Sequence, residues 1–398
     1  MRLLVLNQYY WPGVEATAQL LTELCEALAE DNDVKVVTGV LHGHEDEPRR
    51  VVQNGVEIVR VPSTSFERSK LFARGANYLT YLGNALLRGM RGGPRPDVVL
   101  CMTDPPIVAD VALLVARRYR APLVVISQDV FPEIAMQLKR LENPIVMALL
   151  RGLVSVYLKR ADRVVAIGET MRSRLEEKGA QAERLRVIPN WVDTRRLQPL
   201  EGDNQWALER GYEEKFVVMH SGNIGHAQDL DSLVRAATFL RDLDDLAITI
   251  IGAGARHAEL VALAERLDVD QVKFAFYQPR QLLQQSLSAA DLHVVGLASG
   301  LAGYVVPSRL YGILAVAKPV IVAADPESET AQVVERAGCG IVVPPGRPEL
   351  LARVIRDAHD GKYDLEAMGA RGREWVEREA DRSVAVRRYR DLLLELAS

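Results

Sequence analysis

Short apolar runs alternate with amphipathic stripes along most of the chain. In stretches such as 16–30 and 107–119, apolar residues recur about every three to four positions, the spacing of one helix face. Between such stretches lie apolar runs of strand length, at 2–7, 33–38, 56–61, 97–102, 122–127 and 163–167. Strands that alternate with helices predict a parallel, doubly wound sheet with helices on both faces.

The alternation stops once and then resumes. Residues 194–215 are polar and rich in turn formers, without a clear strand. Strand-like runs return at 216–219, 246–251, 272–274, 291–295 and 319–323. We therefore predict an α/β protein with two Rossmann-like domains that face each other across a cleft. The predicted domains are 1–193 and 216–380, joined by a linker at 194–215, with a last helical segment at 381–398 that packs back toward the first domain.

Composition narrows the class of protein. The chain has 398 residues, 48% of them hydrophobic and 26% charged, which is enough for two domains of ordinary size. A formal net charge of −4 argues against a protein that mainly binds nucleic acid. The three cysteines form no CxxC pair, so we expect a reducing compartment with neither a disulfide framework nor a zinc site. No metal site is evident in the sequence, and we expect no cofactor. We find neither a signal-peptide core nor an apolar run near the roughly 18 residues of a spanning helix, so we expect a soluble or peripheral protein.

Two loops of the first domain carry candidate chemistry. Ligands of doubly wound sheets bind beyond the carboxyl ends of the strands. There, Pro12 and Gly13 allow a ligand to approach the backbone closely, or form only a strand-to-helix turn. Asp129 and Glu133 follow a buried strand, where a carboxylate can accept a hydroxyl proton or bind a sugar. The alternative for Asp129 is a helix cap.

Three loops of the second domain have the composition of a phosphate site. The small-residue loop 221–225 and the glycine turn 252–254 each join a predicted strand to a helix. The segment 307–309, Pro-Ser-Arg, begins a third helix and adds a guanidinium fork suited to phosphate oxygens. An ordinary helix start with a solvated arginine is the alternative. Residues 276–278, Phe-Tyr-Gln, offer an aromatic edge for a planar base.

Two segments, 66–95 and 134–160, combine an apolar stripe with basic residues. Such helices suit an anionic membrane surface, and the alternative is a helix packed on the sheet with a solvated basic face. The apolar stripes are Leu71, Tyr78, Leu82, Leu86 and Met90, and then Met136, Leu141, Val146, Leu149, Leu150 and Leu153. The basic residues are Arg68, Lys70, Arg74, Arg88, Arg91 and Arg95, and then Lys139, Arg140, Arg151, Lys159 and Arg160.

Six motifs in this order resemble the GT-B glycosyltransferases, within them the retaining family numbered four. They are YYWPG at 9–13, DVFPE at 129–133, IPNWVD at 188–193, SGNIG at 221–225, IGAG at 251–254 and VPSRLYG at 306–312. The resemblance covers nearly the whole chain. It is strongest to the bacterial branch that includes colanic-acid and O-antigen N-acetylfucosamine transferases.

The resemblance implies transfer of a sugar from a nucleotide-diphosphate sugar, with UDP favoured and the anomeric configuration kept. It assigns catalytic roles to Asp129 and Arg309, and acceptor binding to Pro12, Gly13, Asp129 and Glu133. The acceptor would be a glycan or a polyprenyl-linked sugar, and the enzyme would lie on the cytoplasmic face of the plasma membrane. The implied donor residues are Ser221, Gly222, Asn223, Gly252, Phe276, Tyr277, Gln278, Pro307, Ser308, Arg309 and Leu310.

The chain departs from the family pattern at charged positions. Many relatives carry two glutamates eight positions apart, and here Tyr304 and Gly312 take those places. The usual Arg and Lys after the glycine loop are Asn223 and Gln228. We infer that Arg309 carries more of the diphosphate charge than its counterpart in relatives, and that Glu329 is a candidate for ribose or sugar hydroxyls.

Two other classes of function fit the same architecture. A nucleotide-sugar 2-epimerase shares the two domains but acts on a soluble substrate, so it does not need basic amphipathic helices. A non-catalytic partner of another transferase would account for the missing glutamate pair.

Overall fold

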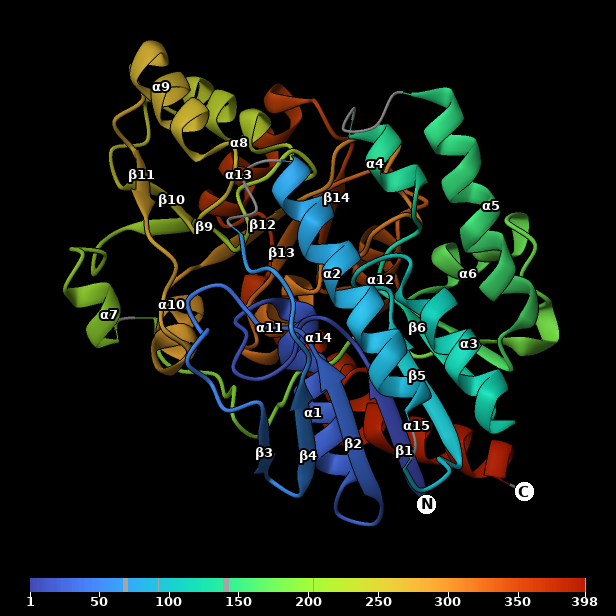
Figure 1. Cartoon of the computed structure of the whole chain (residues 1–398). Coiled ribbons are helices and arrows are strands. Elements are labelled where there is room, and N and C mark those ends of the chain that lie inside the picture. The colour runs from blue at the N-terminus through green and yellow to red at the C-terminus, as the bar shows by residue number, and fades with distance from the viewer. Residues whose placement is uncertain (67–70, 92, 139–142, 203, 398) are drawn as a thin grey trace. The chain divides into compact units, whose positions relative to one another are not determined.

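The computed structural model describes residues 1–66, 71–91, 93–138, 143–202 and 204–397. It forms two compact units, one of Met1–Pro189 with Ala385–Ser398 and one of Asn190–Val384 (Figure 1). The segment 194–215, predicted as a linker, falls inside the second unit. Of the basic residues predicted for a membrane face, Arg68, Lys70, Lys139, Arg140 and the side chain of Arg74 lie outside the described part of the chain, as do Leu141 and the side chain of Leu71.

The first unit is built on an eight-stranded sheet in the order β3-β4-β2-β1-β5-β6-β7-β8, counted over the described residues. All neighbouring strands are parallel except the β3–β4 pair. The strands are β1 (Arg2–Leu6), β2 (Asp33–Thr38), β3 (Arg50–Gln53), β4 (Val56–Arg60), β5 (Val98–Met102), β6 (Leu123–Ser127), β7 (Arg163–Ala166) and β8 (Leu185–Val187).

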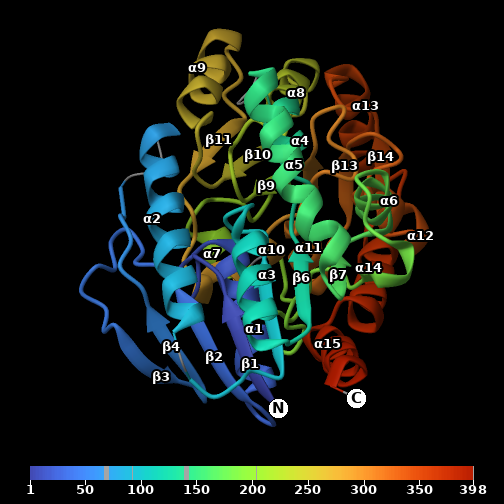
Figure 2. The ribbon, with the colours of Figure 1, turned by 45° about the vertical axis from the view of Figure 1, so that its right-hand side comes forward.

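Helices cover the sheet of the first unit because its central strands are apolar on both faces. Every residue of β5 and of β6 is buried, as parallel strands between helix layers require. A row of three helices, α2, α3 and α5, packs side by side along the sheet (Figure 2). The helices of this unit are α1 (Ala16–Leu28), α2 (Leu71–Met90), α3 (Val108–Tyr119), α4 (Glu133–Gln137), α5 (Pro144–Arg160), α6 (Glu169–Glu177) and most of α15 (Arg382–Ala397).

Strand β3 is an element that the sequence analysis missed. It pairs antiparallel with β4 through a two-residue turn, Asn54-Gly55, whose φ angles are 47° and 81°. Both values lie in the left-handed region that Asn and Gly tolerate best, so this is the turn that fits a tight hairpin. The Asn-Gly pair was the available signal.

The second unit is built on a six-stranded parallel sheet in the order β11-β10-β9-β12-β13-β14, again over the described residues. Its strands are β9 (Phe216–Ser221), β10 (Leu246–Ile251), β11 (Val272–Ala275), β12 (Leu292–Gly296), β13 (Val320–Ala323) and β14 (Gly340–Val343). Its helices are α7 (Gln205–Leu208), α8 (Leu230–Ala236), α9 (His257–Leu267), α10 (Leu283–Ser288), α11 (Arg309–Ala315), α12 (Glu329–Ala337), α13 (Pro348–His359) and α14 (Leu365–Glu379).

Both faces of this second sheet are covered. Helices α8, α9 and α13 share an apolar core with β9, β10, β12 and β13 on one face. On the other face α10 packs against α7, and α11 packs against α14 (Figure 1). The chain order of strand, loop and helix therefore brings the loops after β9, β10, β12 and β13 to the carboxyl edge of one sheet.

The segment before β9 is anchored rather than free. Trp206 on α7 is buried, and the guanidinium of Arg210 lies 3.9 Å from its ring centroid. Further back, Arg373 of α14 donates to the backbone oxygens of Thr194 and Leu197, at 2.9 and 2.7 Å. Thr194 in turn donates its hydroxyl to Asp381 at 2.6 Å. These contacts explain why a polar, strand-free sequence belongs to the second unit.

Helix α14 approaches the end of α11 through a glycine. A Cβ built on Gly369 would lie 2.0 Å from the backbone oxygen of Ala317, so only hydrogen fits there. On α11 itself, a Cβ on Gly312 would lie 3.6 Å from the nearest atom, a methyl carbon of Leu287, which is ordinary contact. The backbone of α14 thus seats directly on the turn that follows α11.

We expect Gly369→Ala to lower the free energy of unfolding by about 1–3 kcal/mol, the usual cost of overpacking a close contact. Gly312→Ala is the matched control, because the added methyl has room and alanine favours helix more than glycine does. Thermal unfolding of both variants checks this. Equal melting temperatures would contradict the close seating of α14.

Candidate active site

The two glycine loops of the second unit are in direct contact. A Cβ on Gly252 would lie 1.8 Å from the backbone oxygen of Gly222, and one on Gly254 would lie 2.2 Å from that of Ile224. Hydrogen bonds from Gly222 to Ile251 and from Ile224 to Ala253, both 2.9 Å, join the loops. The φ of Gly252 is 147°, a conformation that other residues rarely adopt. Two strand ends are therefore fixed against each other.

The predicted donor residues of the first glycine loop differ in exposure. Ser221 ends β9 and is half-buried, whereas Asn223 is exposed. The side-chain oxygen of Gln228 accepts a hydrogen bond from the backbone N–H of Gly225 at 3.0 Å. The Asn223 amide lies 3.5 Å from the same oxygen. Gln228 thus supports the loop from within.

Arg309, the first residue of α11, lies against this loop. Its Cζ would be 3.2 Å from a Cβ on Gly222, so the guanidinium occupies the space that glycine leaves open. Its Nη1 lies 2.7 Å from Nε2 of His220. Burial lowers the pKa of Arg309 to about 10, and the side chain of Tyr277 partly offsets this. At neutral pH the half-buried guanidinium is charged, and its attraction for an anion is stronger there than in bulk water.

The loop that leads into α11 is tied to the neighbouring strand. Asp325, just after β13, accepts hydrogen bonds from the Ser299 hydroxyl at 3.1 Å and from the Gly300 backbone at 2.7 Å. The backbone of Ala298 also donates to Ala227 at 2.8 Å. The long connection from β12 to Arg309 is therefore held at the end nearest β12.

Three further predicted residues sit around the start of α11. Pro307 is buried, and Ser308 is half-buried and makes no side-chain capping bond. The side chain of Leu310 is only 1% exposed, so it belongs to the core and offers no group to a donor. The polar chemistry of this turn rests with Ser308 and Arg309.

The aromatic turn after β11 leaves two rings exposed. Phe276 and Tyr277 are 82% and 62% exposed, and Phe276 stacks in parallel with His257 at a centroid distance of 6.4 Å. Gln278 is engaged elsewhere, because its oxygen accepts from the Trp206 indole at 2.9 Å and its amide donates to Phe276 O at 2.7 Å. The turn is thus fixed by Gln278, and the two rings are the surface that remains for a ligand.

Glu329 lies at the first turn of α12, after β13 and so at the same sheet edge. Its carboxylate accepts a hydrogen bond from Arg336 at 3.1 Å and is 8% exposed. The preceding Ser328 caps the helix by accepting from the backbone of Ala331. The structure therefore gives Glu329 an ion-pair partner inside the domain.

In the first unit, Asp129 lies in the loop after β6. Its Oδ1 accepts a hydrogen bond from the Thr103 hydroxyl at 3.1 Å, and Thr103 follows the neighbouring strand β5. The Ser127 hydroxyl donates to the Asp129 backbone oxygen at 2.9 Å. Burial raises the pKa of the Asp129 carboxyl to about 6, against the opposing effect of the Thr103 bond. A carboxyl with such a pKa suits proton exchange near neutrality.

Glu133 is occupied by two cations. It forms an ion pair with Lys178 and another with Arg151 at 3.0 Å, and its side chain is 12% exposed. Burial opposes its charge, but the bond and charge of Lys178 hold its pKa below the usual range. These contacts tie α4 to α5 and α6, so the structure places Glu133 in an internal ion-pair network.

The loop after β1 contains a tight turn at Gly13. Its backbone donates to Tyr10 O at 2.8 Å, and a Cβ there would lie 2.6 Å from the Glu15 carboxylate and 2.8 Å from Tyr10 O. Pro12, beside it, is half-buried. Gly13 is therefore required by the turn itself, whether or not a ligand approaches.

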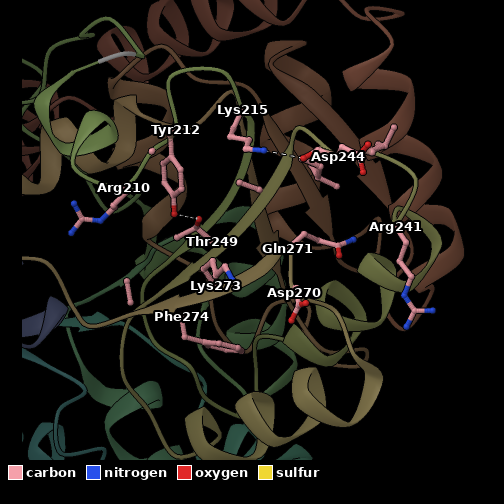
Figure 3. A pocket seen from close by; sticks show the side chains of 15 residues that line it. Arg210, Tyr212, Lys215, Arg241, Asp244, Thr249, Asp270, Gln271, Lys273 and Phe274 are labelled. Atoms are coloured by element: carbon pink, nitrogen blue, oxygen red, sulfur yellow. Dashed lines mark hydrogen bonds between the residues drawn. The ribbon is translucent and has the colours of Figure 1, made fainter.

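A large hollow in the second unit, of about 590 Å³, does not coincide with the glycine loops. Residues that precede β9, β10 and β11, such as Lys215, Asp244 and Gln271, line it, so it lies at the amino ends of these strands (Figure 3). Tyr212 and Thr249 share a hydroxyl hydrogen bond of 2.7 Å there, and Lys215 donates to Asp244 O. The doubly wound fold places ligands at the opposite, carboxyl edge.

Family comparisons agree with the arrangement of the two units. Residues 15–191 match the family described as "Glycosyl transferase 4-like domain", and residues 207–375 match "Glycosyl transferases group 1". Together the two matches span most of the chain. The chain belongs to the family-4 GT-B glycosyltransferases.

Sequence identity to individual relatives is low. The chain is 31% identical over 236 residues to the putative colanic acid biosynthesis glycosyl transferase WcaI of Escherichia coli, covering 58% of this chain and 57% of that protein. It is 26% identical over 297 residues to the probable glycosyltransferase WbjE of Pseudomonas aeruginosa, covering 74% of each. The match to WcaI thus spans little more than half of that relative.

Solved structures support the fold over the full length. Anabaena HepE, solved in complex with UDP and glucose, superposes with a TM-score of 0.78 at 16% identity and covers 100% of both chains. Sucrose-phosphate synthase from Thermosynechococcus elongatus gives a TM-score of 0.79 at 17% identity, covering 100% of this chain and 99% of that one. The predicted GT-B fold is confirmed.

Two residues of this glycosyltransferase escaped the sequence analysis. His220 contacts Arg309, and Asp325 holds the loop before it. The available signals were a histidine one residue before the end of a buried strand and an acid two residues after another. Both are common in ordinary cores, so their importance appears only when β9, β12 and β13 are seen as neighbours.

We expect Asp129→Asn to lower turnover far more than nucleotide affinity, because this residue lies in the unit that does not hold the glycine loops. In the wild-type protein kcat/KM should fall as pH drops through about 6, where the carboxyl becomes protonated. The pH profile of both proteins checks this. Equal losses in turnover and nucleotide affinity would remove Asp129 from the acceptor site.

The same substitution has an expected effect on stability. The folded pKa of about 6 lies above the ordinary value of 3.8, so the folded state holds the proton more tightly, and stability falls as pH rises through this window. Above it, the buried carboxylate costs up to about 3 kcal/mol. Asp129→Asn should therefore raise the melting temperature at pH 8 more than at pH 4. A uniform shift would contradict the raised pKa.

Proposed function

We propose that this glycosyltransferase moves a sugar from a nucleotide-diphosphate sugar, with a UDP-sugar favoured, to a lipid-linked or polysaccharide acceptor in the synthesis of a cell-surface glycan, with retention at the anomeric carbon. The second unit binds the donor and the first binds the acceptor. The observation that carries the proposal is the half-buried Arg309 guanidinium, held against the glycine loop at the carboxyl edge of the second sheet.

A departing diphosphate needs positive charge and N–H donors. Arg309 supplies a fixed cation and guanidinium N–H donors beside the half-buried loop around Gly222, whose Gly222, Ile224 and Gly225 amides are hydrogen-bonded within the unit. Donors held in place before the reaction stabilise developing charge without the cost of reorganisation. Among the described residues no group of three His, Cys, Asp or Glu is placed to hold a metal ion. On this proposal Arg309 supplies the charge stabilisation within this chain.

Retention sets the path of the proton. The bond from the anomeric carbon to the diphosphate oxygen breaks, and the bond to the acceptor oxygen forms on the same face. The acceptor proton passes to the leaving diphosphate, so no separate strong base is required. On this proposal Asp129 accepts a hydrogen bond from the acceptor hydroxyl and orients it.

The relatives support the choice of substrate class. WcaI is named for colanic acid biosynthesis and AmsK of Erwinia amylovora for amylovoran biosynthesis, and HepE was solved with UDP and glucose. Uridine in the donor and a growing glycan as acceptor are the corresponding expectations for this chain.

The products of the reaction test the proposal. The protein is incubated with mixed nucleotide sugars and polyprenyl-linked acceptors, followed by mass spectrometry and by NMR of the new anomeric proton. Free nucleotide with a lengthened, retained glycan is the expected result. An isomerised nucleotide sugar would instead support the epimerase, and binding without turnover the non-catalytic partner.

Arg309→Ala should weaken binding of UDP or GDP by about 1.5–3 kcal/mol, the usual worth of a charge-assisted hydrogen bond. Isothermal titration calorimetry measures this, and Arg353→Ala, at an exposed arginine of α13 in the same unit, is the matched control. If both variants bind as the wild type does, Arg309 does not hold the diphosphate.

We also propose that the protein lies peripherally on the cytoplasmic face of the plasma membrane. Helix α5 exposes an apolar face at helical spacing, with Ile145 79% and Leu149 64% exposed and Leu153 and Val156 further along. Exposed Lys159 and Arg160 follow at its end. This combination suits an anionic surface, where each basic residue is worth about 1 kcal/mol.

Helix α2, the other segment considered for the membrane, uses part of its predicted stripe for the core. Leu82 is buried, and the hydroxyl of buried Tyr81 donates to Val37 O at 3.0 Å. Of the described side chains in this stripe, Met90 is the exposed one. Within the described residues no helix is both long and apolar enough to span a bilayer.

The double substitution Ile145→Ser with Leu149→Ser should reduce cosedimentation with vesicles that contain anionic lipid, because it removes apolar surface that would enter the interface. Leu208→Ser, at an exposed leucine of α7, is the control. Recovery equal to the wild type would show that this face of α5 is only a solvated surface.

A further inference from the structure

The partner of the Arg309 guanidinium is an imidazole, not a carboxylate. Nη1 of Arg309 lies 2.7 Å from Nε2 and 3.3 Å from Nδ1 of His220. Among the described residues no acid forms an ion pair with Arg309, and the one side chain whose charge raises its pKa is Tyr277. The cation at the donor site is therefore oriented without being neutralised.

His220 can play this role only in one protonation state. A guanidinium has donors and no acceptor, so the imidazole must receive this N–H. Because Nη1 is close to both ring nitrogens at once, it lies over the face of the ring and not along the in-plane lone pair of Nε2. Nδ1 lies 3.3 Å from the backbone oxygen of Val294 on β12, an acceptor for this nitrogen when it carries the ring proton. Burial and the adjacent charge of Arg309 hold the pKa of His220 well below its usual value, so the ring is neutral at physiological pH.

The surroundings fix the ring and the guanidinium together. His220 is fully buried near the end of β9, between the neighbouring strands β10 and β12. The guanidinium also lies next to Gly222, where a Cβ would come within 3.2 Å of Cζ. Arg309 thus contacts both the buried ring of His220 and the α-carbon of Gly222, which carries no side chain.

We propose that His220 is a positioning residue for Arg309: its neutral ring accepts one N–H of the guanidinium and holds the fork against Gly222, so that the remaining N–H groups are set for the donor diphosphate. This rests on the proposed function of the same site. An acid in this place would also orient the fork, but it would cancel the charge that the diphosphate needs. A long side chain ordered before binding loses less rotamer freedom when the anion arrives.

The test is UDP affinity, measured by calorimetry on the full chain, for wild type, His220→Leu and His220→Gln, each with and without Arg309→Ala. Leucine removes the acceptor, whereas glutamine offers a carbonyl oxygen near the place of Nε2. We expect a loss of roughly tenfold for leucine and little loss for glutamine. In the Arg309→Ala background the leucine substitution should cause no further loss, because its effect passes through Arg309.

Each outcome separates the two proposals. Wild-type protein that binds neither UDP nor GDP contradicts the proposed function itself. If the wild type binds UDP and His220→Leu binds it equally well, the positioning role of His220 is overturned. It is also overturned if the leucine substitution lowers UDP affinity as much in the Arg309→Ala background as in the wild type.

If the leucine variant does not fold, His220→Asn replaces it, because its shorter side chain can bond Val294 but does not reach Arg309. Weaker UDP binding by the asparagine variant than by the glutamine variant supports the positioning role. Equal binding by the two variants overturns it.

Discussion

The second unit depends on a backbone contact that only glycine permits. The carbonyl of Gly222 occupies the place where any other residue at position 252 would carry its Cβ, and the guanidinium of Arg309 fills the space above the α-carbon of Gly222. Two strands and the start of α11 are thereby fixed at one sheet edge. Supporting contacts come from Asp325, which holds the loop before α11, and from α14, whose Gly369 seats on the turn after it.

The electrostatics of this site follow from that packing. Arg309 is buried enough for its pKa to fall to about 10, yet its close partner is a neutral imidazole, so its charge is kept for a ligand. The acids nearby are used differently, since Glu329 pairs with Arg336 and Asp325 accepts from the backbone and a serine. In the first unit Glu133 is likewise paired, whereas burial raises the pKa of the Asp129 carboxyl to about 6.

Periodicity was enough to predict the alternating strands, the two sheets and the loops at their carboxyl edges, because buried parallel strands are apolar throughout. It missed the edge strands β3, β8 and β14, which are short and only partly buried, although Asn54-Gly55 marked the turn after β3. It could not assign contacts between strands far apart in sequence, so His220 was overlooked. It also could not tell a ligand contact from an internal one: Leu310, Gln278 and Glu133 carry suitable side chains but are occupied by the core, by Trp206 and by Lys178.

The central claim is that the site around Gly222 and Arg309 recognises a nucleotide through its diphosphate. Calorimetric titration of the wild-type protein with UDP and UMP, and with GDP and GMP, tests it most directly. The account predicts that the diphosphate of the preferred base binds at least about tenfold more tightly than its monophosphate, since one charge-assisted hydrogen bond is worth roughly 1.5–3 kcal/mol. Equal affinities for diphosphate and monophosphate would contradict it.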